Sequence, residues 1–189
     1  MQQINQYLSS TLKLLRTERG WSLERAARET GVSKAMLGQI ERGESSPTIA
    51  TLWKVAGGFS VPLSLFIEPP TQNVVVRVAD ELRQQPAEDD MLVAPLFAYT
   101  PEFGFEMFEL TLLPGYERYS EPHEPGITEH VIVLEGEMEL LLAGQWVTMT
   151  KGAAVRFTAD VPHGYRNLSL LPAVFHNLIH YPAAASRAM

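Results

Sequence analysis

The spacing of apolar residues changes once along this chain, at the EPP triplet of residues 68–70. Before it, apolar residues recur at intervals of three and four, the period of an amphipathic helix. Beyond residue 90 they recur mostly at intervals of two, the period of a strand with one buried face, and Gly or Pro ends each run. We therefore predict two domains of different class, an all-α domain over residues 1–67 and an all-β domain over residues 91–189, joined by a linker over residues 68–90.

The first domain is predicted to contain five short helices. Ile4, Leu8, Leu12 and Leu15 form the apolar stripe of a helix that ends near Gly20. Capping residues precede the following helices and glycines end them. The predicted limits are Ser22 and Gly31 for the second helix, Ser33 and Gly43 for the third, Ser46-Pro47 and Gly57 for the fourth, and residues 62–67 for the fifth.

The second domain is predicted to contain eight or more short strands with no helix between them. That pattern is typical of a sandwich or barrel. Inside the linker, the run VVVRV at residues 74–78 is a candidate to pair with the sheet. The other runs with strand character are LVAPLFAYT, GFEMFELTLLP, EHVIVLEG, EMELLLAG, QWVTMTKG, AAVRFTAD, VPHGYRN and PAVFHNLIHYP.

The net charge of −7 is distributed unevenly. Residues 1–67 hold eight Lys/Arg and five Asp/Glu, a net charge of +3, whereas residues 68–189 hold seven Lys/Arg and seventeen Asp/Glu, a net charge of −10. The basic half suits a polyanionic partner and the acidic half does not. The chain has no Cys, which excludes disulfides and thiolate metal sites. It shows no signal peptide and no membrane span, so we expect a cytoplasmic protein.

Two of the predicted helices are joined by residues 30–33 (TGVS) with the spacing of a helix-turn-helix. Small side chains at Ala26 and Ala27 allow the two helices to approach closely. The second of these helices has an apolar face for packing and a face left free for a partner. The packing positions are Val32, Leu37 and Ile40, and the free positions are Lys34, Ala35, Gly38 and Gln39.

Residues 8–67, with the stretch GVSKAMLGQIERGESSPT, resemble the XRE family of Cro- and repressor-like helix-turn-helix domains. The resemblance implies a double-stranded DNA operator, read in the major groove by the second helix, and a homodimer that reads two half-sites. By position, the base-facing candidates are Lys34, Ala35 and Gln39. The phosphate-facing candidates are Ser22, Ser33, Ser45, Ser46 and Arg42. We expect Arg16, Arg19 and Arg25 to be surface charges, and Trp21 and Trp53 to belong to the core.

The second domain contains a pattern of glycine, histidine and glutamate, G-x7-H-x5-E-x6-G, that starts at Gly115 and includes His123 and Glu129. A second pattern, H-x3-N, starts at His163. Both resemble the two short motifs of the cupin fold. The resemblance implies a double-stranded β-helix in which His123, Glu129 and His163 are metal ligands. A further histidine of that family is replaced here by Pro125, and strand alternation directs His130 to the opposite face from Glu129.

The residues leave three interpretations of this cluster open: a divalent transition metal (Zn, Fe, Ni or Mn), a polar pocket without metal, or no functional site. His130, His176 and His180 are expected to be structural or surface residues. Six other side chains could line a pocket that holds an anionic ligand. They are Tyr116, Arg118, Tyr119, Arg156, Tyr165 and Arg166.

The two domains together resemble XRE–cupin transcription regulators over nearly the whole chain. The resemblance implies a regulator whose cupin barrel senses a small-molecule effector and dimerises, without enzymatic activity. The stretches HEPGITEHVIVLEG and LIHYP are similar to regulators of sulfur utilisation in this group, which implies a sulfur-containing effector. Two alternatives remain: a metal-dependent cupin enzyme with an attached DNA-binding module, and a DNA-binding protein whose barrel only dimerises.

Overall fold

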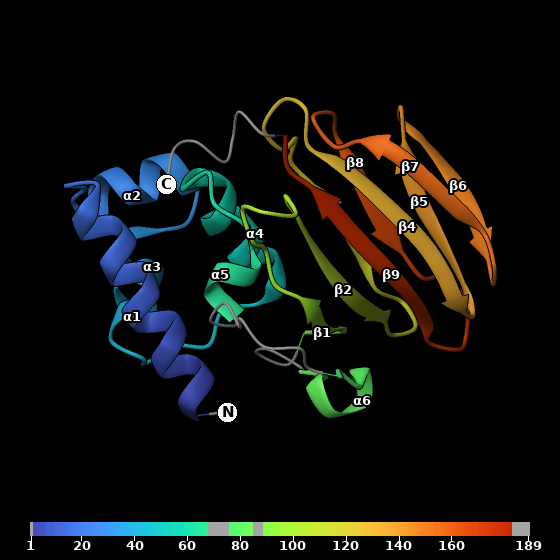
Figure 1. Cartoon of the computed structure of the whole chain (residues 1–189), viewed down its shortest axis with the longest axis horizontal. Helices are drawn as coiled ribbons and strands as arrows, with labels where there is room; N and C mark the ends of the chain where they lie inside the picture. Colours follow the sequence, from blue (N-terminus) through green and yellow to red (C-terminus); the bar gives the residue numbers. More distant parts are fainter. Residues whose placement is uncertain (1, 68–75, 85–88, 183–189) are drawn as a thin grey trace. The chain divides into compact units, whose positions relative to one another are not determined.

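The computed structural model describes residues 2–67, 76–84 and 89–182, with side chains from residue 6 in the first helix. The side chain of Ile4 therefore lies outside the described residues. The chain divides into two compact units, Met1–Thr71 and Gln72–Met189. The first unit is helical and the second is built from two β-sheets (Figure 1). An all-α domain followed by an all-β domain is thus confirmed.

The described part of the helical unit, residues 2–67, contains the five expected helices. Four begin or end close to the predicted positions. The fourth begins later, because Thr48 and not Ser46 is its N-cap, and the Thr48 hydroxyl accepts a hydrogen bond of 3.1 Å from the Thr51 amide. The helices are α1 (Gln2–Glu18), α2 (Leu23–Thr30), α3 (Lys34–Glu41), α4 (Ile49–Gly58) and α5 (Ser64–Ile67).

Close packing of α2 against α4 depends on one glycine. A Cβ atom placed on Gly58 would lie 2.6 Å from the Glu29 carbonyl oxygen and 2.6 Å from Thr30 Cα. These separations are too short for any side chain, so Gly58 lets the end of α4 contact the end of α2. The turn that follows α2 uses Gly31 at φ 67°, in the left-handed region that glycine adopts at low cost.

An ion pair joins α1 to α3. Arg16 donates to both carboxylate oxygens of Glu41, at 2.6 and 2.9 Å, and to the Trp21 carbonyl oxygen at 2.8 Å. The side chains are only 15% and 8% exposed. The expectation that Arg16 is a surface charge was therefore wrong, because its bidentate pair is nearly buried and fixes α3 against α1.

Within residues 76–84 and 89–182, the β unit contains nine strands in two antiparallel sheets, with orders β1-β2-β9-β4-β7 and β3-β8-β5-β6. The eight expected runs all contain strands, and β3 was not predicted. The strands are β1 (Met91–Phe97), β2 (Phe105–Leu112), β3 (Glu117–Ser120), β4 (Thr128–Glu135), β5 (Glu137–Leu142), β6 (Gln145–Thr150), β7 (Ala154–Thr158), β8 (His163–Arg166) and β9 (Ala173–His180).

Part of the segment expected to be a linker has structure of its own. A one-turn helix, α6 (Ala79–Leu82), precedes an isolated bridge between Gln84 and Val93 of β1. Of the run at residues 74–78, the first two residues lie outside the described residues, and the last three form no strand. None of the helices in the described part of the chain is long and apolar enough to cross a bilayer.

The inner faces of the two sheets form one apolar core. Along β4 and β9 burial alternates with period two, so that Val131, Val133, Phe175 and Ile179 are buried while their neighbours are not. Two polar residues, Glu129 and Asn177, lie on these same inner faces and are also buried. They mark the position of the candidate site in the barrel.

Replacing Glu41 by Gln is expected to lower the free energy of unfolding of the helical unit by about 2 kcal/mol, because Arg16 stays nearly buried without its anionic partner. Urea denaturation followed by the far-ultraviolet helical signal measures this loss. Glu44→Gln is the matched control, because Glu44 also forms a bidentate pair, with Arg42, but at an exposed position. Equal losses in the two variants would contradict a structural role for the Arg16–Glu41 pair.

Candidate functional site

The helix-turn-helix is built from two capped helices around the turn at Gly31. Ser22 and Ser33 are the N-caps of α2 and α3, and their hydroxyls accept hydrogen bonds from the amides of Arg25 and Met36 at 3.1 and 3.2 Å. These hydroxyl groups therefore hold the helix N-termini in place. A phosphate at these positions could still accept hydrogen bonds from the two hydroxyl groups and from the neighbouring helix amides.

One face of α3 packs inward and the other is exposed. Leu37 and Ile40 are fully buried, as expected. The expectation that Gly38 lies on the free face was wrong. Gly38 is buried, and a Cβ atom there would lie 3.1 Å from an Arg42 guanidinium nitrogen. The exposed residues of α3 are Lys34, Ala35, Met36 and Gln39, which include the three predicted base-facing residues.

Charged residues on this surface are paired with acids. Lys34 Nζ lies 2.9 Å from a carboxylate oxygen of Glu24, and this hydrogen bond holds the pKa of Glu24 below its ordinary value. Arg42 forms a bidentate pair with Glu44 at 2.8 and 2.7 Å. Both pairs are exposed, so DNA phosphates could compete with the carboxylates for these cations.

The remaining residues predicted around the interface have varied surroundings. Ser45 and Ser46 are partly buried in the loop between α3 and α4. Arg19 donates to the Phe59 carbonyl oxygen and lies over the Trp21 ring, and the Trp21 and Phe59 rings are 4.9 Å apart. Trp21 therefore packs against core residues, as predicted, whereas Arg19 is tied to that packing and is more than a surface charge.

The second candidate site lies inside the barrel. His123 comes from the loop before β4, Glu129 from β4 and His163 from β8. One Glu129 oxygen lies 3.0 Å from His123 Nε2 and 3.5 Å from His163 Nε2. Ligand atoms of the three residues all lie within 4.8 Å of one another, so the structure brings together the cluster predicted from the sequence.

Two residues that were not predicted as partners of Glu129 complete its surroundings. Asn177 donates to the second Glu129 oxygen at 2.9 Å, and the Tyr165 hydroxyl donates to the same oxygen. Tyr165 had been named only as a possible pocket residue. Strand alternation in β9 could have identified Asn177, because this polar residue shares the buried face of the strand with Phe175 and Ile179, two positions away on either side.

The protonation of this cluster follows from its charges. Burial acts to raise the pKa of Glu129, but His123 and His163 outweigh it and keep the pKa well below its ordinary value. Burial acts to lower the pKa of His163, but the Glu129 carboxylate outweighs it and raises that pKa. Burial and the same carboxylate raise the pKa of Tyr165 well above its ordinary value, so Tyr165 remains a hydrogen-bond donor.

His163 has the geometry of a metal ligand. Its Nδ1 lies 2.9 Å from the Val161 carbonyl oxygen, which can only accept, so Nδ1 carries the hydrogen. Its Nε2 is buried and makes no hydrogen bond of normal geometry with any described residue. In the neutral ring, Nε2 is therefore an acceptor, and it faces a Glu129 oxygen that is also an acceptor. Two acceptors at this separation require a proton or a cation between them.

The three other histidines face away from the cluster. His130, His176 and His180 occupy the positions on β4 and β9 that alternate with the buried ones, and each is partly or fully exposed. This agrees with the expectation that they are structural or surface residues. Pro125, which stands where the cupin family has a further histidine, is exposed in the loop before β4.

The six side chains expected to line an anion pocket do not form one group. Arg118 is close enough to Tyr116, Tyr165 and Glu129 for their charges to affect it, and burial lowers its pKa. Burial also raises the pKa of Tyr116 to about 12. The other three point elsewhere: Tyr119 is exposed, Arg166 pairs with Glu139, and Arg156 lies on the outer face of β7.

Known proteins resemble this chain in both units. Residues 12–66 match the helix-turn-helix family and residues 108–179 match the cupin domain. The chain is 50% identical to the HTH-type transcriptional regulator SutR of Escherichia coli (strain K12), over 96% of this chain and 99% of SutR. It is 28% identical to the HTH-type transcriptional regulator PuuR of the same organism, over 84% of this chain and 86% of PuuR.

A solved structure also has the same arrangement of elements. The crystal structure of an HTH_3 family transcriptional regulator from Vibrio cholerae superposes with a TM-score of 0.82 at 43% sequence identity, covering 95% of this chain and 98% of that chain. The aligned stretch includes both the helix-turn-helix and the barrel. The protein therefore belongs to the HTH-type transcriptional regulators that combine an N-terminal helix-turn-helix domain with a C-terminal cupin domain.

Proposed function

We propose that this regulator binds an operator as a homodimer through the exposed face of α3, and that its barrel senses a small metabolite at the cluster of His123, Glu129 and His163. The observation that carries the proposal is the presence of two separate polar sites in one chain: an exposed helix face on the basic unit, and a buried His–Glu–His cluster in the acidic unit. The first suits DNA and the second suits a small ligand.

The DNA contacts follow from exposure and chemistry. Gln39 can accept from and donate to an adenine edge, Lys34 can reach guanine acceptors, and Ala35 can contact a thymine methyl group. Ser22, Ser33, Ser45, Ser46 and Arg42 are assigned to phosphates on the flanks. One such unit makes few contacts, so specific affinity requires two units that read two half-sites.

The barrel cluster fits a divalent transition metal. Its donor set of two imidazoles and one carboxylate suits Zn, Fe, Ni or Mn, and the unpartnered His163 Nε2 fits a cation facing Glu129. A bound ion would provide a coordination position for an anionic group of the effector. Tyr165 and Asn177 hold the Glu129 carboxylate in place by hydrogen bonds, whether or not an ion is bound.

Sensing is favoured over catalysis for this barrel. The relatives that match across both units are named as transcriptional regulators. Glu129 already accepts hydrogen bonds from Tyr165 and Asn177, so it is a poor general base. A sulfur-containing effector, implied by the similarity to regulators of sulfur utilisation, is the ligand class to test first.

Replacing Gln39 by Ala is expected to weaken operator binding by about 1–3 kcal/mol and to relax the preference at one base pair in each half-site. Fluorescence anisotropy at fixed salt, with an operator selected from random duplexes, measures the affinity. Binding to non-specific duplex should not change. Gln145→Ala, at the exposed first residue of β6, is the matched control. Unchanged affinity and base preference in Gln39→Ala would exclude this reading face.

Replacing Glu24 by Gln is expected to strengthen DNA binding about threefold, because the change releases Lys34 and removes a negative charge beside the duplex. The gain should appear on operator and non-specific DNA alike and should shrink as salt is raised. Glu137→Gln, an exposed residue of the barrel, serves as the control. Weaker binding in Glu24→Gln would show that the Glu24–Lys34 pair positions Lys34 for its contact.

Replacing His163 by Ala is expected to abolish metal binding and the effector response while operator affinity without ligand stays the same. Thermal shifts with Zn, Fe(II), Ni or Mn chlorides, and with a panel of thiosulfate, cysteine and a sulfonate, measure binding to the barrel. His176→Ala, on the outer face of β9, is the control and should respond like the natural protein. Undiminished metal and panel responses in folded His163→Ala would remove the cluster from the proposal.

A further inference from the structure

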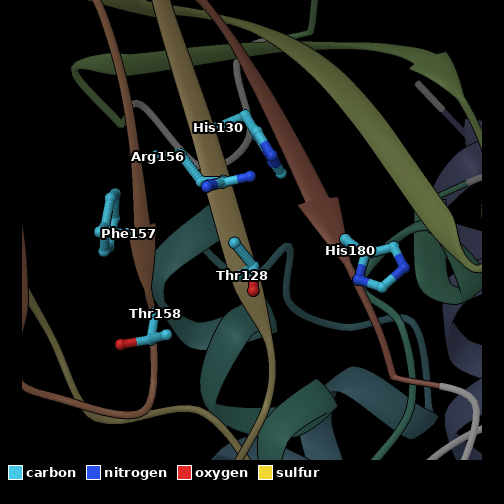
Figure 2. Close-up of a pocket in the computed structure, with 6 residues that line it drawn as sticks. All are labelled: Thr128, His130, Arg156, Phe157, Thr158 and His180. Atoms are coloured by element: carbon cyan, nitrogen blue, oxygen red, sulfur yellow. The ribbon is translucent and has the colours of Figure 1, made fainter.

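A separate pocket lies on the outer face of the five-stranded sheet, at the ends of β9, β4 and β7. Its volume is about 540 Å³, and its opening faces away from the barrel interior. In the strand register His130 is opposite Arg156, and Thr128 is opposite both Thr158 and His180. Adjacent strands therefore bring these side chains to one place. Phe157 completes the lining (Figure 2).

The pocket is lined by hydrogen-bond donors. One guanidinium, two imidazoles and two hydroxyl groups surround it, and its described lining residues include no acid. The β unit as a whole carries a large excess of acids, so a concave site without a carboxylate and with a guanidinium is distinctive. Such a set of groups matches the acceptor oxygens of an anion.

The polar groups of the pocket are not used by the fold. Among the residues that the structure describes, Arg156 forms no hydrogen bond or ion pair, and neither do the side chains of Thr128, Thr158 and His180. His130 Nδ1 is buried and has no hydrogen-bond partner. Figure 2 shows Arg156 extending from β7 over β4 toward His130. The buried His130 Nδ1 therefore lacks a partner within the described protein, and the exposed Arg156 guanidinium is free to pair with an anion.

We propose that this outer pocket binds a small oxyanion: the carboxylate, phosphate or sulfate group of a metabolite. Arg156 binds two of its oxygens, and His130, His180 and the threonine hydroxyls donate to the others. A polyanion such as DNA is disfavoured, because the surrounding unit is strongly acidic and would repel the flanking phosphates. A small anion has no flanking phosphates, so it is repelled less than DNA.

This pocket is distinct from the cluster inside the barrel. On β4, Glu129 faces inward and His130 outward, and on β7 the Phe157 ring packs 5.4 Å from the His163 ring while Arg156 extends outward. The two sites therefore lie on opposite faces of the same pair of strands. A ligand in the outer pocket would be a second input to the regulator, separate from the effector of the inner cluster.

Calorimetric titration of the full chain tests the proposal with three probes: inorganic phosphate, inorganic sulfate and succinate. Ionic strength is held constant with sodium chloride. At least one probe is expected to bind with a Kd of about 1 mM or lower, and Arg156→Gln should weaken that binding about tenfold or more. Lys151→Gln removes the same charge at an exposed turn outside the pocket and should change the Kd less than about twofold.

Two further variants locate the bound anion. Thr128→Val, which removes one donor with little change of volume, should weaken binding about threefold or more while circular dichroism shows a folded chain. His163→Ala should leave the Kd unchanged, so the result is independent of the inner cluster and of the effector proposed for it. No heat from any probe up to about 50 mM, or equal weakening by Arg156→Gln and Lys151→Gln, would overturn the outer site. Loss of operator affinity in Arg156→Gln without oxyanion binding would overturn it in favour of a DNA contact.

Discussion

The barrel interior depends on the pairing of one buried carboxylate. An ionised Glu129 without partners would cost on the order of several kcal/mol in this apolar core. His123 contacts one of its oxygens, while Tyr165 and Asn177 donate to the other. The remaining requirement is a positive group between Glu129 and His163, either a proton or a metal ion. A proton on His163 meets this requirement, and a metal ion in its place would do the same.

The alternation of strand β4 gives the β unit two chemical surfaces from one segment. Glu129 faces the apolar core, where charges interact strongly, and His130 faces the outer pocket, where water screens them. Because β7 repeats this arrangement with Phe157 inside and Arg156 outside, the antiparallel register places Glu129 and the outer pocket on opposite faces of the same strands, and the loop before β4 adds His123 to the inner cluster.

Features with local causes could be predicted from the sequence, and those that depend on register could not. Ser22, Ser33 and Gly31 act within one turn of their own helices, so the helix-turn-helix limits were predicted closely. The fourth helix was misplaced because several capping residues precede it in a row. The Arg16–Glu41 pair and the groups around Glu129 join residues far apart in the chain; strand alternation can place Asn177 on the inner face of β9, but it does not specify Glu129 as its partner. The outer pocket was missed for the same reason, although Arg156 had been singled out as an anion ligand.

The weak positive charge of the helical unit is consistent with the proposal that two copies of it read the operator together. The net charge of +3 over residues 1–67 is small, and Lys34 and Arg42 are already paired with Glu24 and Glu44, so a single helix-turn-helix gains little from phosphates. In the proposed dimer, affinity comes from two α3 helices at a fixed spacing. A ligand that favours one spacing by about 1–3 kcal/mol changes operator affinity by about five- to 150-fold. That energy is comparable to a few charge-assisted hydrogen bonds, which is the scale that either site of the barrel can supply.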